Sequence, residues 1–364
     1  MKNKLLKLML FSSLIAMVSC DPFNTEIEKN SPEETVVKYT AGNIKTPVDK
    51  DTLKVVSWNI KFGGGRIDFF FDCYGDKVLM SKDSVIYNMN GVVAEINHLD
   101  PDIIFLQEAD INSKRSAYVD QVQWILDNTN LNYGVYASQW QADYVPSDGI
   151  GKVNSGNAIL SKYPLDDAKR IALSLIGDQS AVVQYFYLRR NLLEASVTIK
   201  DKKIYLLGTH ASAYATDDTK KKQLQEIKNE TVNLVKNKSI FILGGDFNTI
   251  PPNSKKYENF DDDKCAEGSD FASLGFKDEL NDMQPFYDDY QAAISQEEYD
   301  AENSAFFSFT SDKNGFWNRK LDYLFTNGNF VKFSGLVHQD KAHGGAETMP
   351  LSDHAPLSVL YVLP

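Results

Sequence analysis

Several apolar runs of this chain are followed by side chains that could hold a cation or handle a proton. These side chains are Asn59, Glu108, Asp246 and Asn248, and His354 near the C-terminal end completes the set. A hard cation such as Mg²⁺ takes oxygen ligands and keeps several waters, so one or two carboxylates at strand ends suffice to bind it. We interpret this set as the machinery of phosphoryl transfer with a divalent cation.

Asp246 and Asn248 stand two residues apart beyond the apolar run 240–243. Alternate side chains of an extended chain point to the same face, so both can reach one site. Gly244 and Gly245 permit the sharp backbone that such an approach needs. A turn stabilised by Asp or Asn is the alternative explanation for the pair.

His210 and His354 are two of five histidines, and both follow β-rich segments. An imidazolium can stabilise charge that develops on phosphoryl oxygens, and a neighbouring carboxylate raises its pKa and fixes its tautomer. Asp353 precedes His354 and is a further candidate near the cation. A histidine satisfied within the core is the alternative for each position.

Apolar spacing predicts the elements that must position these residues. Helical spacing indicates a helix over 81–99, which Pro101 ends, and further helices around 122–126 and 224–235. Strands are expected at 53–58, 102–106, 186–199, 203–208, 239–243, 321–325, 331–333 and 357–362. Strand-rich segments interleaved with a few helices favour an α+β or mixed α/β core.

The N-terminus has the pattern of an export signal. Lys2, Lys4 and Lys7 precede an apolar stretch at 8–18 that is too short to span a bilayer, and 17–20 resembles a bacterial lipobox. We therefore expect a lipoprotein signal peptide at 1–20, a flexible tether at 21–51 and a catalytic domain at 52–364. Lipid on Cys20 would hold the exported protein on a bacterial membrane, facing the periplasm or the cell exterior. An uncleaved anchor or a plain signal peptide is the alternative.

The formal net charge of −12 gives no long-range attraction toward nucleic acid or anionic lipid. A local basic patch or bound cations can offset this charge, so neither partner is excluded. No protein partner follows from the sequence.

Seven segments resemble, in order, the motifs of the endonuclease/exonuclease/phosphatase superfamily. They are Ser57-Trp58-Asn59-Ile60, Leu106-Gln107-Glu108, Ser155-Gly156-Asn157-Ala158-Ile159-Leu160-Ser161, Thr209-His210, Gly245-Asp246-Phe247-Asn248, Leu321-Asp322-Tyr323 and Ser352-Asp353-His354-Ala355-Pro356-Leu357. The resemblance implies a four-layer α/β/β/α sandwich with two facing mixed β-sheets, and a hydrolase of phosphoester bonds.

The resemblance also implies a role for each residue. Glu108 would be the principal ligand of Mg²⁺, with Mn²⁺ as an alternative, and Asn59 and Asp353 would lie near it. Asp246 would orient the attacking water, and Asp322 would be the partner of His354. The phosphoryl oxygens would be bound by Asn248, His210 and His354, whereas Asn157 would either approach the site or stabilise a loop. Apart from the resemblance, Arg189 and Arg190 would point to opposite faces of a strand, and we favour Arg190 as the one that clamps a phosphate. A phosphate contact between positions 108 and 157 stays open among Lys114, Arg115, Tyr118, Tyr133, Tyr136, Trp140 and Tyr144.

Two long loops depart from a minimal member of the family. Phe69–Phe71 in the loop after Asn59 are expected either to shape the substrate pocket or to pack beneath the loop. Asp261–Asp263, after Asn248, would form an acidic wall that disfavours a bulky polyanion. We therefore favour a small or lipid-derived phosphoester as substrate over nucleic acid, whose hydrolysis by an extracellular nuclease is the alternative. An inactive binding protein ranks last, because the principal site residues are present.

Cys73 and Cys265 remain after Cys20 is assigned to lipid, and cysteines of exported proteins are usually paired. Cys73 follows the Asn59 motif and Cys265 follows the Asn248 motif, and the resemblance places both motifs at one rim of the fold. We predict a Cys73–Cys265 disulfide, with two buried thiols as the alternative. Mass analysis of the exported protein without reductant should find no free thiol; two free thiols would contradict the pairing.

Overall fold

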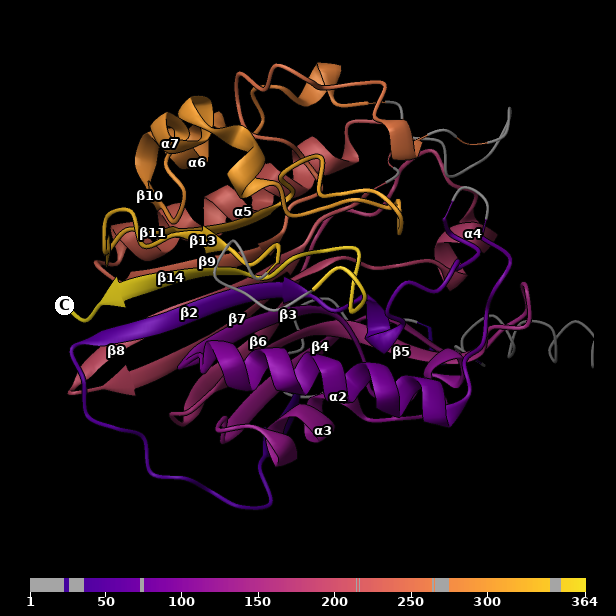
Figure 1. The fold of residues 1–364 in the computed structure, drawn as a ribbon, viewed down its shortest axis with the longest axis horizontal. Coiled ribbons are helices and arrows are strands. Elements are labelled where there is room, and N and C mark those ends of the chain that lie inside the picture. The colour runs from indigo at the N-terminus through magenta and orange to yellow at the C-terminus, as the bar shows by residue number, and fades with distance from the viewer. Residues whose placement is uncertain are drawn as a thin grey trace, which may run out of the picture.

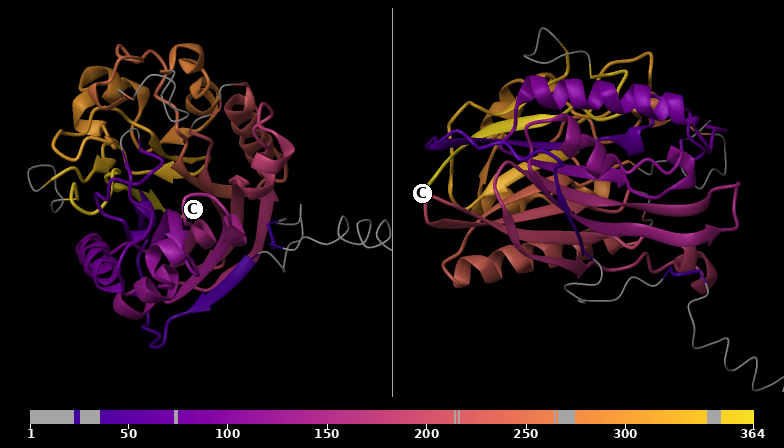
Figure 2. Two further views of the ribbon diagram at one scale, coloured as in Figure 1. Left: turned by 90° about the vertical axis from the view of Figure 1, so that its right-hand side faces the viewer. Right: turned by 90° about the horizontal axis from the view of Figure 1, so that it is seen from below.

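Two β-sheets lie face to face between outer layers of helices in the computed structural model of this chain (Figures 1 and 2). The structure describes residues 23–25, 36–72, 75–213, 215, 217–263, 265, 275–340 and 348–364. The first sheet has the order β1-β4-β5-β3-β2-β14-β12, with β13 also paired to β14, and the second has the order β10-β11-β9-β8-β7-β6. Both sheets are mixed, which confirms the expected four-layer sandwich.

The first sheet is built from both ends of the described chain. Its strands are β1 (Val36–Thr40), β2 (Thr52–Asn59), β3 (Ile103–Asp110), β4 (Tyr133–Val145), β5 (Gly151–Ser161), β12 (Asn329–Phe330), β13 (Leu336–Val337) and β14 (Leu357–Val362). The second sheet comprises β6 (Leu165–Ala172), β7 (Asn191–Ile199), β8 (Lys202–His210), β9 (Ile240–Asp246), β10 (Gln291–Ala292) and β11 (Asp322–Thr326).

Helices cover the outer face of each sheet. The helices are α2 (Lys82–Leu99), α3 (Gln121–Asn128), α4 (Ala181–Phe186), α5 (Thr219–Lys236), α6 (Gln284–Asp289) and α7 (Gln296–Ala301). Short 3₁₀ turns are η1 (Lys61–Gly63), η2 (Lys114–Ser116), η3 (Asp261–Asp263), η4 (Lys277–Glu279) and η5 (Asn303–Phe306). In the right view of Figure 2, α2 covers one sheet and α5 covers the other. No helix within the described ranges has both the length and the apolar character of a membrane span.

Helix α2 shows how local sequence sets an outer layer. The Ser81 side chain accepts a hydrogen bond from the backbone N–H of Ser84, which caps the first turn. The apolar residues at helical spacing are buried against the first sheet. Side chains of both sheets fill the space between them, among them the fully buried Phe105 and Leu206. Burial of this apolar area is the main favourable term in folding.

Parallel pairing places the candidate residues at one edge. β2 pairs parallel with β3, and β8 pairs parallel with β9. In the second pair, His210 at the end of β8 lies directly opposite Asp246 at the end of β9. Asn59, the last residue of β2, pairs with Gln107, next to Glu108. Because the carboxyl ends of parallel strands meet at one edge, the polar side chains of both sheets converge there.

Most predicted elements are confirmed, but some segments differ and several short elements were not expected. Residues 186–190 do not form strand: Phe186 ends α4, and its carbonyl accepts a hydrogen bond from the Trp140 indole at 2.8 Å. The chain turns at 331–333, directly after β12, and the strand predicted for these residues is therefore wrong. The long hairpin β4–β5 and strand β6 were not predicted, because apolar and polar residues alternate irregularly there around register shifts.

The segment expected as a flexible tether contains ordered structure. β1 pairs antiparallel with β4 along its whole length, and Phe23 also contacts β4 through its carbonyl, which accepts from the backbone N–H of Asp143 at 2.6 Å. The expected signal peptide lies outside the described residues. Cys265 is disulfide-bonded, and Cys73 lies outside the described residues, so the pairing stays a prediction.

The close approach of Gly245 on β9 to the backbone of β8 can be tested by substitution. A Cβ at this position would lie 2.0 Å from the carbonyl oxygen of Thr209 on β8, and the glycine has φ +153°. We expect Gly245→Ala to lower the free energy of unfolding by about 2–4 kcal/mol in urea denaturation, because the strand backbones must separate. The matched control is Gly208→Ala on β8, where the nearest atom is a side-chain carbon at 3.3 Å. Equal losses in both variants would contradict this explanation.

Candidate active site

The Asp246 carboxylate is the centre of the site. Its Oδ2 lies 3.1 Å from Asn59 Nδ2, 3.3 Å from His210 Nε2 and 3.4 Å from His354 Nε2. Its Oδ1 accepts a hydrogen bond from the backbone N–H of Asn248 at 2.9 Å. Burial raises the pKa of Asp246, although the charge of His354 opposes that effect. The structure therefore brings four predicted site residues to one carboxyl group.

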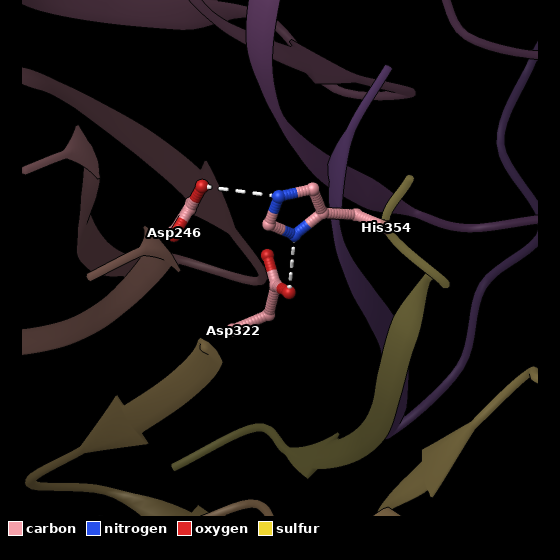
Figure 3. A group of neighbouring side chains, drawn as sticks. All are labelled: Asp246, Asp322 and His354. Carbon is pink, nitrogen blue, oxygen red and sulfur yellow. Dashed lines mark hydrogen bonds and ion pairs between the residues drawn. The ribbon is translucent and has the colours of Figure 1, made fainter. Parts of the chain in front are cut away.

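His354 lies between two carboxylates, as Figure 3 shows. Its Nδ1 is 2.8 Å from Asp322 Oδ2, which also accepts from the hydroxyl of Ser308 at 2.6 Å. Burial alone would lower the pKa of His354, but the charges of Asp322 and Asp246 outweigh burial and raise the pKa to about 10. His354 is therefore an imidazolium at neutral pH, and Asp322 is the partner that the sequence predicts.

His210, unlike His354, is a neutral imidazole. Burial lowers the pKa of His210 well below its usual value, and the charges of Arg190 and His354 lower it further. Its Nδ1 lies 3.3 Å from the amide nitrogen of Gln139. A neutral ring that accepts from Gln139 at Nδ1 has its proton on Nε2, which faces Asp246. The two histidines thus present one charged and one neutral ring to the same carboxylate.

Glu108 is turned into the site by an irregularity in β3. The register with β5 shifts between Leu106 and Ala109, and Glu108 adopts a positive φ of 57°. Its Oε1 accepts from Asn59 Nδ2 at 3.2 Å and lies 4.0 Å from His210 Nε2. A left-handed non-glycine residue is uncommon and here serves to aim a carboxylate.

Asn59 contributes its amide nitrogen to the site. The nitrogen bridges Glu108 and Asp246, whereas Oδ1 accepts from the backbone N–H of Lys61 at 3.0 Å. We expected Asn59 near the metal, and in this arrangement it orients two carboxylates. Asp353 is bound at 3.0 Å by Lys61 Nζ, which also lies 3.0 Å from Asp72.

The carboxylates of Glu108 and Asp353 fit a hard cation. Burial raises the pKa of Glu108, and the charge of Asp353 raises it further, so a cation would relieve both effects. Asp246, Asp322 and His354 also offer ligand atoms within 4.8 Å of one another. We favour Glu108 over this second group as the metal ligand. A protonated His354 has no lone pair to give a metal, and both of its ring nitrogens already face carboxylates.

A pocket of about 170 Å³ opens beside these residues. Of the predicted residues, Glu108, Arg190, His210, Asp246, Asn248, Asp353 and His354 line it. Asn157 does not; it is fully buried, and its amide nitrogen donates to the Asn191 side chain at 3.2 Å. Among the open candidates for a phosphate contact, Arg115 and Trp140 line the pocket.

Aromatic side chains form one wall of this pocket. Phe69 and Phe71 belong to it, and the Phe71 ring stacks on Trp140 with centroids 5.7 Å apart. The Arg115 guanidinium lies 3.8 Å from the Phe62 ring centroid. The loop after Asn59 therefore combines the two outcomes that the sequence left open: Phe71 and Phe69 line the pocket, and Phe69 is also buried against Phe70 beneath the loop.

Asp262, the middle residue of the acidic wall expected from Asp261–Asp263, is not free to repel a polyanion. It lines the pocket but lies 2.9 Å from Arg319 Nη1 and accepts from Asn318 Nδ2 at 2.7 Å. The Arg319 guanidinium offsets its charge. The expected repulsion of nucleic acid is therefore weakened at Asp262.

Sequence reasoning missed several lining residues, namely Lys61, Asp72, Gln139, Tyr187, Leu188 and Phe309. Lys61 follows Asn59 by two residues, a spacing that could have indicated a shared face. Gln139 lies on the unpredicted strand β4, and no local signal marks it.

The comparisons with known proteins agree with this geometry. A sequence model described as the Endonuclease/Exonuclease/phosphatase family matches residues 56–354. An endonuclease/exonuclease/phosphatase from Beutenbergia cavernae DSM 12333 is 16% identical, with a TM-score of 0.56 over 86% of this chain and 72% of that one. A family protein from Leptotrichia buccalis C-1013-b is 16% identical, with a TM-score of 0.52 over 84% and 98%. One from Bacteroides vulgatus is 14% identical, with a TM-score of 0.51 over 86% and 100%. At these identities the structures show the fold alone. No curated protein matches the chain.

The pair His354–Asp322 generates a prediction on pH dependence. Asp322 acts with Asp246 and Asp353 against burial to raise the pKa of His354 to about 10, so removal of Asp322 lowers that pKa. Asp322→Asn therefore loses the imidazolium at a lower pH than the unaltered chain does. We expect the alkaline limb of the kcat/KM profile to move to lower pH by at least one unit, with a smaller loss of activity at pH 6. Asp167→Asn, at an exposed ion pair with Lys203, should leave the profile unchanged. An unmoved alkaline limb in Asp322→Asn would contradict the charge assignment.

Proposed function

This chain belongs to the endonuclease/exonuclease/phosphatase family, and on that premise we propose that it hydrolyses a phosphoester bond with the help of a divalent cation. The observation that supports the proposal is the Asp246 carboxylate, which is buried and faces Asn59, His210 and His354 within 3.4 Å. A carboxylate held in this way can orient a water and accept its proton.

The chain's own residues would divide the work of in-line attack. Asp246 orients the attacking water and accepts its proton, and a raised pKa makes it a stronger base. The charged ring of His354 stabilises negative charge on the phosphoryl group, and Arg190 at the pocket wall can add to it. Glu108 and Asp353, which both line the pocket, would hold Mg²⁺ or Mn²⁺, and the cation would supply further charge neutralisation at phosphoryl oxygens.

We propose a small or lipid-derived phosphoester as the substrate. The aromatic wall of the pocket suits an apolar group next to the phosphate, and two of the guanidinium groups that line the pocket, those of Arg115 and Arg319, already bind Asp110 and Asp262. A nuclease remains the second candidate, because Arg319 offsets the charge of Asp262 in the acidic wall that argued against it. We also propose that the protein is exported and anchored by lipid on Cys20, as the N-terminal pattern predicts.

Chelation and three substitutions test this function. The purified protein should hydrolyse an activated phosphodiester or monoester with Mg²⁺ or Mn²⁺ and lose activity on exhaustive chelation. Glu108→Gln, Asp246→Asn and His354→Ala should each lower turnover by about a hundredfold or more, the scale for a preorganised electrostatic group. Full activity after chelation would exclude the metal role.

The control variant is His98→Ala, an exposed histidine at the end of α2, which should keep full activity. Thermal unfolding of every variant separates lost chemistry from lost structure. A panel of plasmid DNA, RNA, phospholipid and soluble sugar or inositol phosphates then separates the proposed substrate class from the nuclease alternative.

A further inference from the structure

Helix α4 lies at one end of the sandwich (Figure 1). None of its residues is buried; Val182 is 71% exposed and Val183 46%. Residues 179–188 include no charged side chain, in a chain with 24% charged residues. Tyr144 on β4 is 54% exposed. We call Val182, Val183 and Tyr144 the α4 surface.

The first described residues of the chain contact the same place. The Phe23 ring lies 5.6 Å from Phe186, the last residue of α4, and 6.4 Å from Tyr144. The Phe23 carbonyl accepts from the backbone N–H of Asp143 at 2.6 Å, and Thr25 is buried. Phe23 therefore joins α4 to β4 and is part of the folded domain.

The distance from Phe23 to Cys20 is limited by the covalent chain. Three residues span at most about 11 Å even when fully extended. A lipid on Cys20 would enter the bilayer at that point, so Phe23, which contacts Tyr144 and the last residue of α4, would lie within about 11 Å of the anchoring position. The ordered contact at Phe23 leaves no long tether to hold the domain away from the membrane.

The residues that follow α4 belong to the pocket. Tyr187 and Leu188 come directly after the helix, and both line the pocket with Arg190 and His210. Leu188 packs with Phe71 and Trp140 in one apolar cluster. The chain therefore leads from α4 into the pocket wall within two residues.

We propose that the α4 surface contacts the anchoring bilayer and places the pocket at the level of the lipid headgroups, so that the substrate is a phospholipid of that membrane. Valine and tyrosine side chains at an interface gain by burial in the headgroup region, whereas the chain's formal charge of −12 gives no general attraction to anionic lipid. The contact is therefore apolar and local. The substrate assignment rests on the proposed phosphoesterase activity; the contact surface does not.

Another exposed side chain serves as a matched control. Phe333 is 79% exposed and follows β12, which pairs with the last residues of β14. That end of β14, marked C in Figure 1, lies opposite α4. Phe333 has no described link to Cys20 or to the pocket lining.

The contact surface is tested on the full lipidated protein in vesicles of phosphatidylethanolamine and phosphatidylglycerol with brominated acyl chains. Val182→Trp and Phe333→Trp each add one indole to the same four native tryptophans. We expect bromine to quench more than half of the emission added by Val182→Trp and less than a tenth of that added by Phe333→Trp. Equal quenching, or none at Val182→Trp, would overturn the proposed orientation. Intact-mass analysis of the same preparation must show lipid on Cys20; an unmodified Cys20 would also overturn the proposal.

The substrate class is tested by activity on two substrates. The double variant Val182→Asp with Val183→Asp should hydrolyse a phospholipid headgroup ester in vesicles at least tenfold more slowly, and a soluble phosphodiester at the unaltered rate. Phe333→Asp should change neither rate. Equal rates on lipid in the double variant and the unaltered chain would overturn the proposal. If the unaltered chain cleaves the soluble ester but no phospholipid, the substrate assignment alone is overturned. If it cleaves neither, the proposed function is overturned. The quenching result decides the contact surface in either case.

Discussion

Burial of the Asp246 carboxylate requires hydrogen-bond donors and positive charge from both sheets at one edge of the sandwich. A carboxylate removed from water is costly unless it is paired and hydrogen-bonded. Asn59 and His354 reach it from the first sheet, and His210 reaches it from β8 of the second. The relative position of the sheets is thus tied to the chemistry of one side chain.

The two histidines show how surroundings give one residue type two roles. His354 lies between Asp246 and Asp322, and their charges raise its pKa above the value that burial alone would give. His210 faces the same Asp246, but burial, Arg190 and His354 lower its pKa. Groups whose pKa values are pushed apart in one site are typical of acid–base chemistry.

The loops decide what reaches this centre. The segment after Asn59 supplies an aromatic wall with Trp140, and the segment after Asn248 supplies Asp262, which is neutralised by Arg319. A rigid sandwich with variable loops at one edge is a common basis for different specificities. Tyr187 and Leu188, which follow α4, also belong to the pocket lining.

The sequence by itself determined the identity of the central residues and the helices that carry a clear apolar period, such as α2. These features are local: a strand that ends at a carboxylate, or apolar residues at helical spacing, can be recognised within a few positions. The sequence also indicated Asp322 as the partner of His354, through motif order.

Only the tertiary structure decided how these residues meet. The contact of Asn59 with Asp246 joins residues 187 positions apart, and that of the Trp58 indole with the His354 carbonyl joins residues 296 apart. The position of Gln139 on β4 and the contact of Phe23 with α4 depend on strand pairing across the whole chain. Such contacts have no local pattern, because which side chains meet is set by register and sheet packing and not by their neighbours in sequence.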